Sequence, residues 1–164
     1  MPAPNARPLL SEDQAAFVSG PVSIVAASCL PGQRSTLARV QACQVDGERR
    51  GVVIVLHSEQ AAELLGMIDS GAAIAVAYSD PQTHRSLQLK GYDARRVELP
   101  SGKADALAEA HTAEFTTAVE PMGFSPALTR TVIRGTAAPL VAIAFTPEAA
   151  YLQTPGPGAG ARLP

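Results

Sequence analysis

The feature of this sequence that most constrains its fold is the pair Asp46-Gly47, which lies between two apolar segments, Leu37–Val45 and Gly51–Leu56. An Asp-Gly pair between strand-forming residues is a strong short-range signal for a hairpin of two antiparallel strands. Alternation along the first segment predicts two faces, one with Ala38, Val40 and Ala42 and the other with Arg39, Gln41 and Cys43. The hairpin therefore favours an antiparallel sheet over a parallel one.

The remaining elements follow from periodicity and from helix-breaking residues. Ser11 and Gln14 form a capping-box pattern, which predicts a short helix that ends at Gly20-Pro21. We expect further strands over Val22–Cys29, Ala72–Tyr78, Arg85–Leu99, Pro139–Phe145 and Ala149–Gln153, and further helices from Ser58 to Ile68, over Lys103–Val119 and from Ser125-Pro126 onward. Strands and helices in this mixed order predict a mainly β, α+β or barrel fold. We expect one domain over 1–164, with an N-terminal arm at 1–9 and a Pro/Gly-rich C-terminal arm at 154–164.

Composition limits the class of protein and its partners. The chain has 46% hydrophobic and 17% charged residues, which excludes intrinsic disorder. Its 13 Lys and Arg against 15 Asp and Glu, with no basic run, argue against a nucleic-acid partner. The longest apolar run is far shorter than the roughly 18–20 residues that cross a bilayer, and the N-terminus lacks the apolar core of a signal peptide. We therefore expect a cytoplasmic domain with no membrane partner.

The cysteines and histidines show no metal-site spacing, so we predict no metal site. Cys29 and Cys43 lie within predicted strands, and we expect small buried hydrophobic residues rather than nucleophiles. His111 falls on the apolar stripe of the long helix, which predicts a packing role. His57 ends a strand directly before a helix, where functional side chains often lie, and His84 lies in a polar loop.

Two segments offer groups for an anionic ligand. In Leu56–Gln60 a strand leads into a helix start capped by Ser58, whose free N–H groups and positive dipole end are a general anion site. Glu59 can serve as that helix's own anion, so an ordinary capped helix is the alternative. Thr83–Ser86 brings hydroxyls, an imidazole and a guanidinium to a strand entrance, which suits a phosphate or a planar polar ligand. A solvated loop is the alternative there.

The order of elements and these two segments resemble the FMN-binding split barrels of the pyridoxamine 5'-phosphate oxidase-like family, in the smaller branch described as related to that oxidase. The resemblance spans about Leu10 to Gly160 and is carried best by Thr83–Gly91 (THRSLQLKG) and Gln153–Gly160 (QTPGPGAG). It implies an antiparallel, six-stranded split β-barrel with flanking helices. It also implies a homodimer that holds FMN in clefts between its two subunits.

The resemblance implies flavin contacts from the first hairpin, the strand-to-helix turn and the polar start of a later strand. The matching positions are Arg39, Gln41, Val55, Leu56, His57, Ser58, Gln60, Arg85 and Ser86. The oxidases hold the flavin phosphate with adjacent basic residues after the strand, where this chain has Ser58-Glu59-Gln60. We expect Arg85 to replace those cations, with Arg39 as the alternative. The Arg-x-His segment that binds the pyridoxal substrate in the oxidases has no match in Ala149–Pro164, so we do not expect a pyridoxamine phosphate oxidase.

Two functional hypotheses follow. The first is a homodimeric flavoprotein, an oxidoreductase in which FMN exchanges electrons with an unidentified small molecule and whose catalytic residues are unknown. The second is a split-barrel binding protein without redox catalysis, because Glu59 and Gln60 leave the cleft to haem or another planar ligand, with His57, His84 or His111 as an axial ligand. Dimerisation is expected in both cases, since strands such as Val22–Cys29 are apolar on both faces and the helices are too few to cover them.

Overall fold

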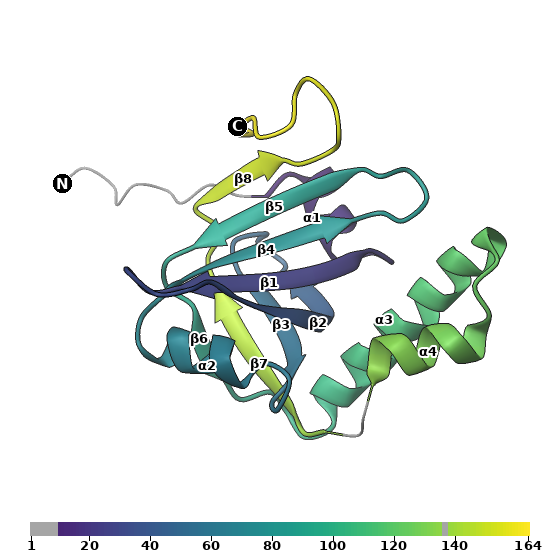
Figure 1. Cartoon of the computed structure of the whole chain (residues 1–164), viewed down its shortest axis with the longest axis horizontal. Helices are drawn as coiled ribbons and strands as arrows, with labels where there is room; N and C mark the ends of the chain where they lie inside the picture. The colour runs from purple at the N-terminus through teal and green to yellow at the C-terminus, as the bar shows by residue number, and fades with distance from the viewer. Residues whose placement is uncertain (1–9, 136–137) are drawn as a thin grey trace.

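The computed structural model describes residues 10–135 and 138–164, so the predicted arm at 1–9 lies outside the described residues. The described chain forms one eight-stranded sheet in the order β6-β7-β3-β2-β1-β4-β5-β8, with every neighbouring pair antiparallel (Figure 1). In chain order the elements are α1 (Glu12–Val18), β1 (Ser23–Cys29), β2 (Thr36–Val45), β3 (Val52–His57), α2 (Ala62–Asp69), β4 (Ala73–Ser79), β5 (Ser86–Gly91), β6 (Arg95–Val97), α3 (Lys103–Val119), the 3-10 turn η1 (Glu120–Met122), α4 (Pro126–Arg134), β7 (Leu140–Phe145) and β8 (Ala149–Leu152). No helix in the described ranges is long and apolar enough to cross a membrane.

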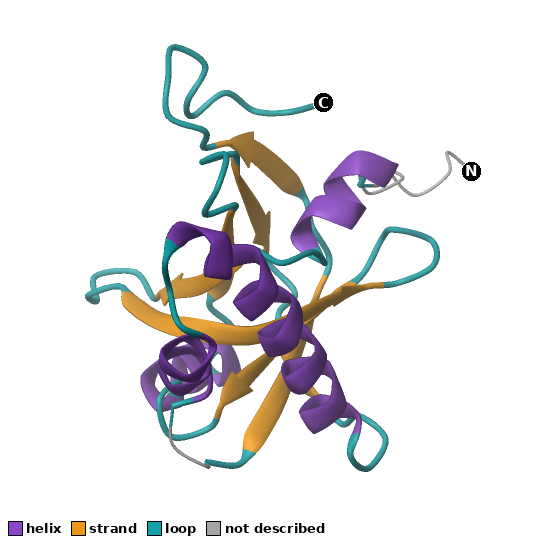
Figure 2. Cartoon of the chain, turned by 90° about the vertical axis from the view of Figure 1, so that its right-hand side faces the viewer, coloured by secondary structure: helices purple, strands orange, loops and turns teal. Residues whose placement is uncertain are grey.

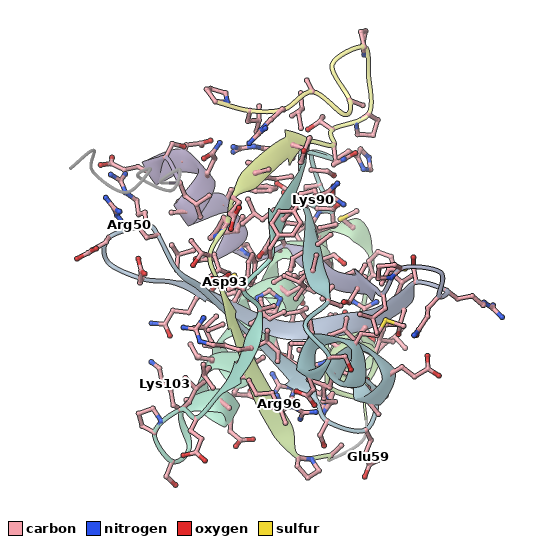
Figure 3. All side chains as sticks on the ribbon, turned by 90° about the vertical axis from the view of Figure 1, so that its left-hand side faces the viewer. Arg50, Glu59, Lys90, Asp93, Arg96 and Lys103 are labelled. Carbon is pink, nitrogen blue, oxygen red and sulfur yellow. The ribbon has the colours of Figure 1, made fainter. Side chains whose placement is uncertain are left out.

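This antiparallel sheet with flanking helices confirms the predicted fold class, with eight described strands in place of six. The difference arises partly because the predicted strand Arg85–Leu99 is two strands, β5 and β6, which lie in opposite halves of the sheet. Figure 3 shows the crossing, with Asp93 between Lys90 of β5 and Arg96 of β6. The carboxylate of Asp93 accepts hydrogen bonds of 2.7 Å from both the backbone N–H and the hydroxyl of Thr146, just after β7. These bonds hold the two halves of the sheet together.

Gly91 shows how closely the chain approaches β7 at this crossing. A Cβ atom at Gly91 would lie 2.7 Å from the Phe145 ring and 2.7 Å from the Thr146 carbonyl oxygen. A side chain would force these atoms apart. Close packing therefore requires a glycine at the end of the THRSLQLKG segment. Gly91 thus allows β5 to pass close to the end of β7.

The predicted hairpin is confirmed, and Asp46 stabilises its turn by accepting hydrogen bonds from the backbone N–H groups of Arg50 (2.9 Å) and Gly51 (2.7 Å). A β-bulge shifts the β2–β3 register between Val40 and Ala42. Val40 and Cys43 both belong to the main core, whereas Ala42 does not. The predicted alternation of faces therefore holds up to Val40 and is wrong beyond it, because the bulge inserts one extra residue.

The main core fills the concave side of the curled sheet. It joins apolar residues from the strands with residues of α1 and α2, such as Val18, Leu64 and Leu65. The long helix α3 packs on the opposite, outer face of β2, β3 and β7, and Figure 2 shows it in front of the strands. A second cluster, Phe115, Val119 and Ile133, joins α3 to α4. The outer face therefore divides into a part that helices cover and a part that they leave open.

The C-terminal arm, predicted to be extended, folds back along β8. Leu152 donates its N–H to Ala161 (2.8 Å), Leu163 donates to Ala150 (2.8 Å), and Tyr151 forms an isolated antiparallel bridge with Arg162. Gly160 also donates to Leu152 (2.7 Å). The Pro/Gly-rich segment thus serves as the turn that returns the chain to the sheet.

Candidate functional site

Strand β2 marks the boundary between the open and the covered parts of the outer face. Arg39 pairs with Val25 of β1, is exposed, and forms no ion pair among the described residues. Gln41 lies two residues after Arg39 in the same strand and is fully buried. Two predicted ligand positions that are neighbours in the sequence therefore lie in opposite environments.

A row of small residues crosses the covered part of the outer face. Ala42 of β2 pairs with Val55 of β3, and Val55 pairs with Ala142 of β7. All three are buried, yet none belongs to the main core. Because α3 packs on these same three strands, the row forms the surface beneath the helix. Val55 thus lies under α3, whereas Leu56 points into the main core.

His57 connects the end of β3 to α4. Its ring is buried, with Nε2 2.6 Å from the backbone oxygen of Arg134 and Nδ1 3.3 Å from that of Ala138. Both ring nitrogens thus face backbone carbonyls of the α4–β7 connection. The predicted functional histidine at the strand end therefore has a structural partner.

The predicted helix start at Ser58 is wrong. Helix α2 begins at Ala62, and its N-cap Ala61 offers no capping side chain. Ser58 donates its backbone N–H to Pro139 (2.9 Å), and Ala61 donates to His57 (3.0 Å), so residues 58–61 form a turn. This turn is held by the connection to β7, a tertiary contact that local sequence does not specify. The expected anion site on a Ser58-capped helix is therefore not formed. Glu59 (Figure 3) is exposed on the turn, and so is Gln60.

Arg85 is engaged by α1. Its guanidinium forms an ion pair with Asp13, with Nη1 donating to Oδ1 at 3.2 Å, and lies 4.4 Å from the ring centre of Phe17. The hydrogen bonds from Arg85 hold the pKa of the Asp13 carboxyl below its usual value. Arg85 thus docks the first helix on the loop before β5. An acidic residue such as Asp13 is common in the first turn of a helix, so the sequence did not indicate an ion pair with Arg85.

Ser86 lies at the opposite side of the open face from Arg39. Its hydroxyl donates to the His84 carbonyl (3.1 Å) and lies 2.9 Å from the Ser79 hydroxyl. Ser86 pairs with Ser79, and Ser79 pairs with Ser23 of β1. The structure therefore places Arg39, Gln41, Val55 and His57 on the neighbouring strands β2 and β3 but in different environments, and it places Arg85 and Ser86 three strands away.

The open part of the outer face lies over β1, β4 and β5, and Figure 1 shows no helix in front of these strands. On β1 and β4 its surface consists of half-buried small side chains, Val25, Ala27, Ala75 and Ala77, and on β5 the half-buried Gln88 and Lys90 lie beside them. Leu37, at its border, is 68% exposed, which is unusual for a large apolar side chain. We call this surface, bounded by Arg39 and Ser86, the open face.

His111 and the two cysteines are not among the side chains that define the open face. His111 is buried and its ring stacks on Phe115, which confirms the predicted packing role. Cys43 is buried as predicted, and burial raises the pKa of its thiol to about 12. Cys29 is exposed at the end of β1, so the prediction of burial is wrong there. Within the described ranges, no three His, Cys, Asp or Glu side chains gather as a metal site.

Comparison of the sequence finds no matching family model and no matching curated protein. Comparison of the structure does find similar proteins. A "putative pyridoxamine 5'-phosphate oxidase" from Lactobacillus delbrueckii has a TM-score of 0.53 at 12% identity, over 87% of this chain and 93% of that one. An F420 reductase has a TM-score of 0.51 at 17% identity, over 86% of this chain and 98% of that one.

HupZ from Group A Streptococcus is similar as well, with a TM-score of 0.56 at 8% identity over 93% of this chain and 99% of that one. These likenesses cover nearly the whole of each chain at low identity. They show that this chain has the fold of the pyridoxamine 5'-phosphate oxidase-like proteins, as the sequence predicted.

Proposed function

We propose that this chain is a flavin-binding oxidoreductase in which FMN lies across β2, with its phosphate beside Arg39. The observation that carries the proposal is the exposed guanidinium of Arg39 at the boundary of the open face, which pairs with no carboxylate in the described part of the chain. Similar structures that include an F420 reductase and a "putative pyridoxamine 5'-phosphate oxidase" support it.

Arg39 suits the phosphate better than Arg85 does. An arginine fork binds phosphate oxygens through two parallel N–H groups, provided that no carboxylate already occupies it. Arg85 is occupied by Asp13, whereas Arg39 is exposed and outside any described ion pair.

When bound, FMN would supply the electron transfer, and the residues of this chain would bind and orient it. Arg39 would neutralise the phosphate. Among the described side chains, none is identified by its environment as a general acid or base for a particular substrate.

We also propose that two copies pair through the open face. The small half-buried side chains of β1 and β4 and the exposed Leu37 form an apolar patch, bordered by Gln88 and Lys90 of β5, and subunit interfaces bury patches of this kind beneath a polar rim. A partner on this surface would lie beside Arg39 and complete the cleft from the other side.

FMN and riboflavin titrations of wild type and Arg39→Ala test the proposal. Loss of a charge-assisted phosphate contact costs about 1.5–3 kcal/mol, so FMN affinity should fall at least tenfold. Riboflavin lacks the phosphate and should bind both proteins alike. The control is Arg34→Ala, another exposed arginine, which should leave both affinities unchanged. A wild-type protein that binds no FMN at tens of micromolar would contradict the proposal.

A second candidate function is binding of a planar ligand such as haem without redox catalysis. The observation that favours it is the turn Ser58-Glu59-Gln60, which offers an acid and an amide instead of cations. His57 and His111 are buried, so the exposed His84 is the accessible axial ligand among the described histidines. A haem titration in which His84→Ala leaves the Soret band unchanged would remove this histidine from consideration.

A further inference from the structure

Helix α4 carries large apolar side chains on a side that α3 does not cover. Thr129 and Ile133 are buried, and Ile133 belongs to the cluster that joins α4 to α3. Leu128 and Val132, one turn apart on the neighbouring side of the helix, are 55% and 57% exposed. Large exposed apolar residues continue into the segment before the helix with Met122 and Phe124. We call Met122, Phe124, Leu128 and Val132 the α4 patch, and an exposed group of this kind marks an interaction surface.

The open face lacks the kind of cover that the rest of the outer face has. Beneath α3, the outer face consists of small buried side chains such as Ala42 and Ala142. On β1 and β4 the open face has side chains of the same kind, such as Ala27 and Ala77. Because a helix packs closely on the first surface, a helix also fits the second. Figure 1 shows α4 beside the strands of the open face and not over them.

The dimensions of a helix match the apolar part of the open face. A helix is about 10 Å across, and two neighbouring strands are about 10 Å wide, so one helix covers β1 and β4 and leaves the polar side chains of β5 at the rim. Leu128 and Val132 lie about 6 Å apart along the axis of α4, and Val25 and Ala27 lie about 7 Å apart along β1. The large side chains of the α4 patch can therefore enter the spaces above successive small ones.

The area of the open face indicates that a dimer needs a second surface. Strands β1 and β4 have seven residues each, so the apolar part of this face is about 23 Å long and about 10 Å wide, or roughly 230 Å². A stable interface buries about 800 Å² on each partner. Pairing of one open face with the other falls short of this area. Each copy therefore has to bring a further apolar surface to the interface, and the α4 patch is such a surface.

We propose that in the dimer α4 of each copy packs on the open face of the other. Two-fold symmetry makes this contact occur twice, so each copy contributes both a helix and a sheet surface. Arg39 pairs with Val25 of β1, so the partner's α4 would form the wall of the cleft beside Arg39. This inference rests on the pairing of two copies in the proposed function, and adds the element that the partner brings to the site.

Two variants each alter one side of the proposed contact. Leu128→Glu puts a carboxylate into the α4 patch, and Ala77→Lys puts an ammonium group into the open face. Each variant alone should raise the dimer dissociation constant at least about tenfold, because both contacts of its dimer would bury an unpaired charge. Ala127→Glu is the matched control and should dimerise as wild type does, because this exposed residue lies on a different side of α4 from Leu128 and Val132.

A mixture of the two variants identifies which surfaces meet. In a dimer of one Leu128→Glu copy and one Ala77→Lys copy, one contact joins two unaltered surfaces, and the other places the carboxylate on the surface that carries the ammonium group. The mixture should therefore dimerise at concentrations at which sedimentation velocity shows each variant alone as a monomer. Dimerisation of the mixture also shows that both variants are folded.

The outcomes separate this inference from the proposed function. A dimeric Leu128→Glu, or a mixture that stays monomeric, overturns the role of α4. FMN affinity that still depends on Arg39 would then leave the flavin proposal standing. A monomeric wild type overturns both this inference and the proposed pairing.

Discussion

The Nε2 atom of His57 lies 2.6 Å from the backbone carbonyl oxygen of Arg134, which ends α4. The last carbonyls of a helix have no partner within the helix, and a buried one needs a donor from elsewhere. His57 supplies that donor from the end of β3. It thereby fixes the position of α4 relative to the sheet.

We expect His57→Phe to lower the free energy of unfolding by about 1–3 kcal/mol, because the aromatic ring fills the site but leaves the carbonyl without a donor. Urea unfolding followed by circular dichroism measures the change. His84→Asn is the control, since His84 is exposed and asparagine tolerates its positive φ of 61°. An unchanged midpoint for His57→Phe would show that the Arg134 contact contributes nothing.

The stability of the protein should depend on pH through His111. Burial holds the pKa of this histidine below its usual value of 6.5, and a hydrogen bond to the Val22 backbone partly offsets the effect. The unfolded chain therefore binds the proton more readily than the folded one. The stabilisation is complete above the ordinary pKa and is lost as pH falls through the lowered one.

Urea unfolding at pH 7, 6 and 5 measures this dependence. We expect the free energy of unfolding to fall over this range in wild type and to fall less in His111→Gln, which cannot titrate. The carboxyls whose pKa values lie below their usual values of 3.8 (Asp13, Asp69 and Asp80) and 4.5 (Glu109) act mainly below pH 5, and both proteins contain them, so the difference between the two profiles isolates His111. A parallel pH profile for the two proteins would exclude His111 as the source.

The two cysteines should differ sharply in reactivity. Cys29 is exposed, whereas Cys43 is buried, has a thiol pKa raised to about 12, and lies 3.5 Å from the Tyr78 hydroxyl. Since the thiolate is the reactive form, a chromogenic disulfide reagent at pH 8 should modify one thiol in the folded protein and two in denaturant. The Cys29→Ser variant should show no fast reaction. Two fast thiols in wild type would contradict the buried position of Cys43.

A charge in the middle of the open face should prevent dimerisation. Ala77 pairs with Val25 on one side and Gln88 on the other, so Ala77→Glu places a carboxylate at the centre of the proposed interface. Sedimentation velocity at micromolar concentration should show a dimer for wild type and a monomer for the variant. Ala110→Glu, on the exposed side of α3, should remain a dimer. A monomeric wild type would refute pairing through this face.

Local sequence patterns predicted the parts of the fold that depend on neighbouring residues. The Asp46-Gly47 hairpin and the Ser11–Gln14 capping box are confirmed because their hydrogen bonds lie within a few residues. The predicted alternation of faces along β2 is wrong from Gln41 onward. A bulge depends on how both partner strands pack, and alternation within one strand does not reveal it.

The candidate site was less predictable, because its geometry depends on contacts between distant residues. From the sequence, Ser58 was predicted to cap a helix, but its backbone N–H binds the Pro139 carbonyl in a turn. Arg85 was predicted to be available to a phosphate, but it pairs with Asp13, which is 72 positions away in the sequence. Nothing in the local sequence around α3 indicates which strands it covers. Whether a predicted ligand position is open or covered is therefore information that only the assembled fold contains.

The return of residues Ala161–Leu163 along β8 has a consequence for behaviour in solution. An unpaired outer strand is a template on which other chains can add, and this is a common route to aggregation. The returning arm occupies that template at β8, while β6 at the other end of the sheet has only three residues, two of them arginines. Residues Ala161–Leu163 thus block edge-to-edge association at β8, and a protein shortened at Thr154 would expose the edge of this strand.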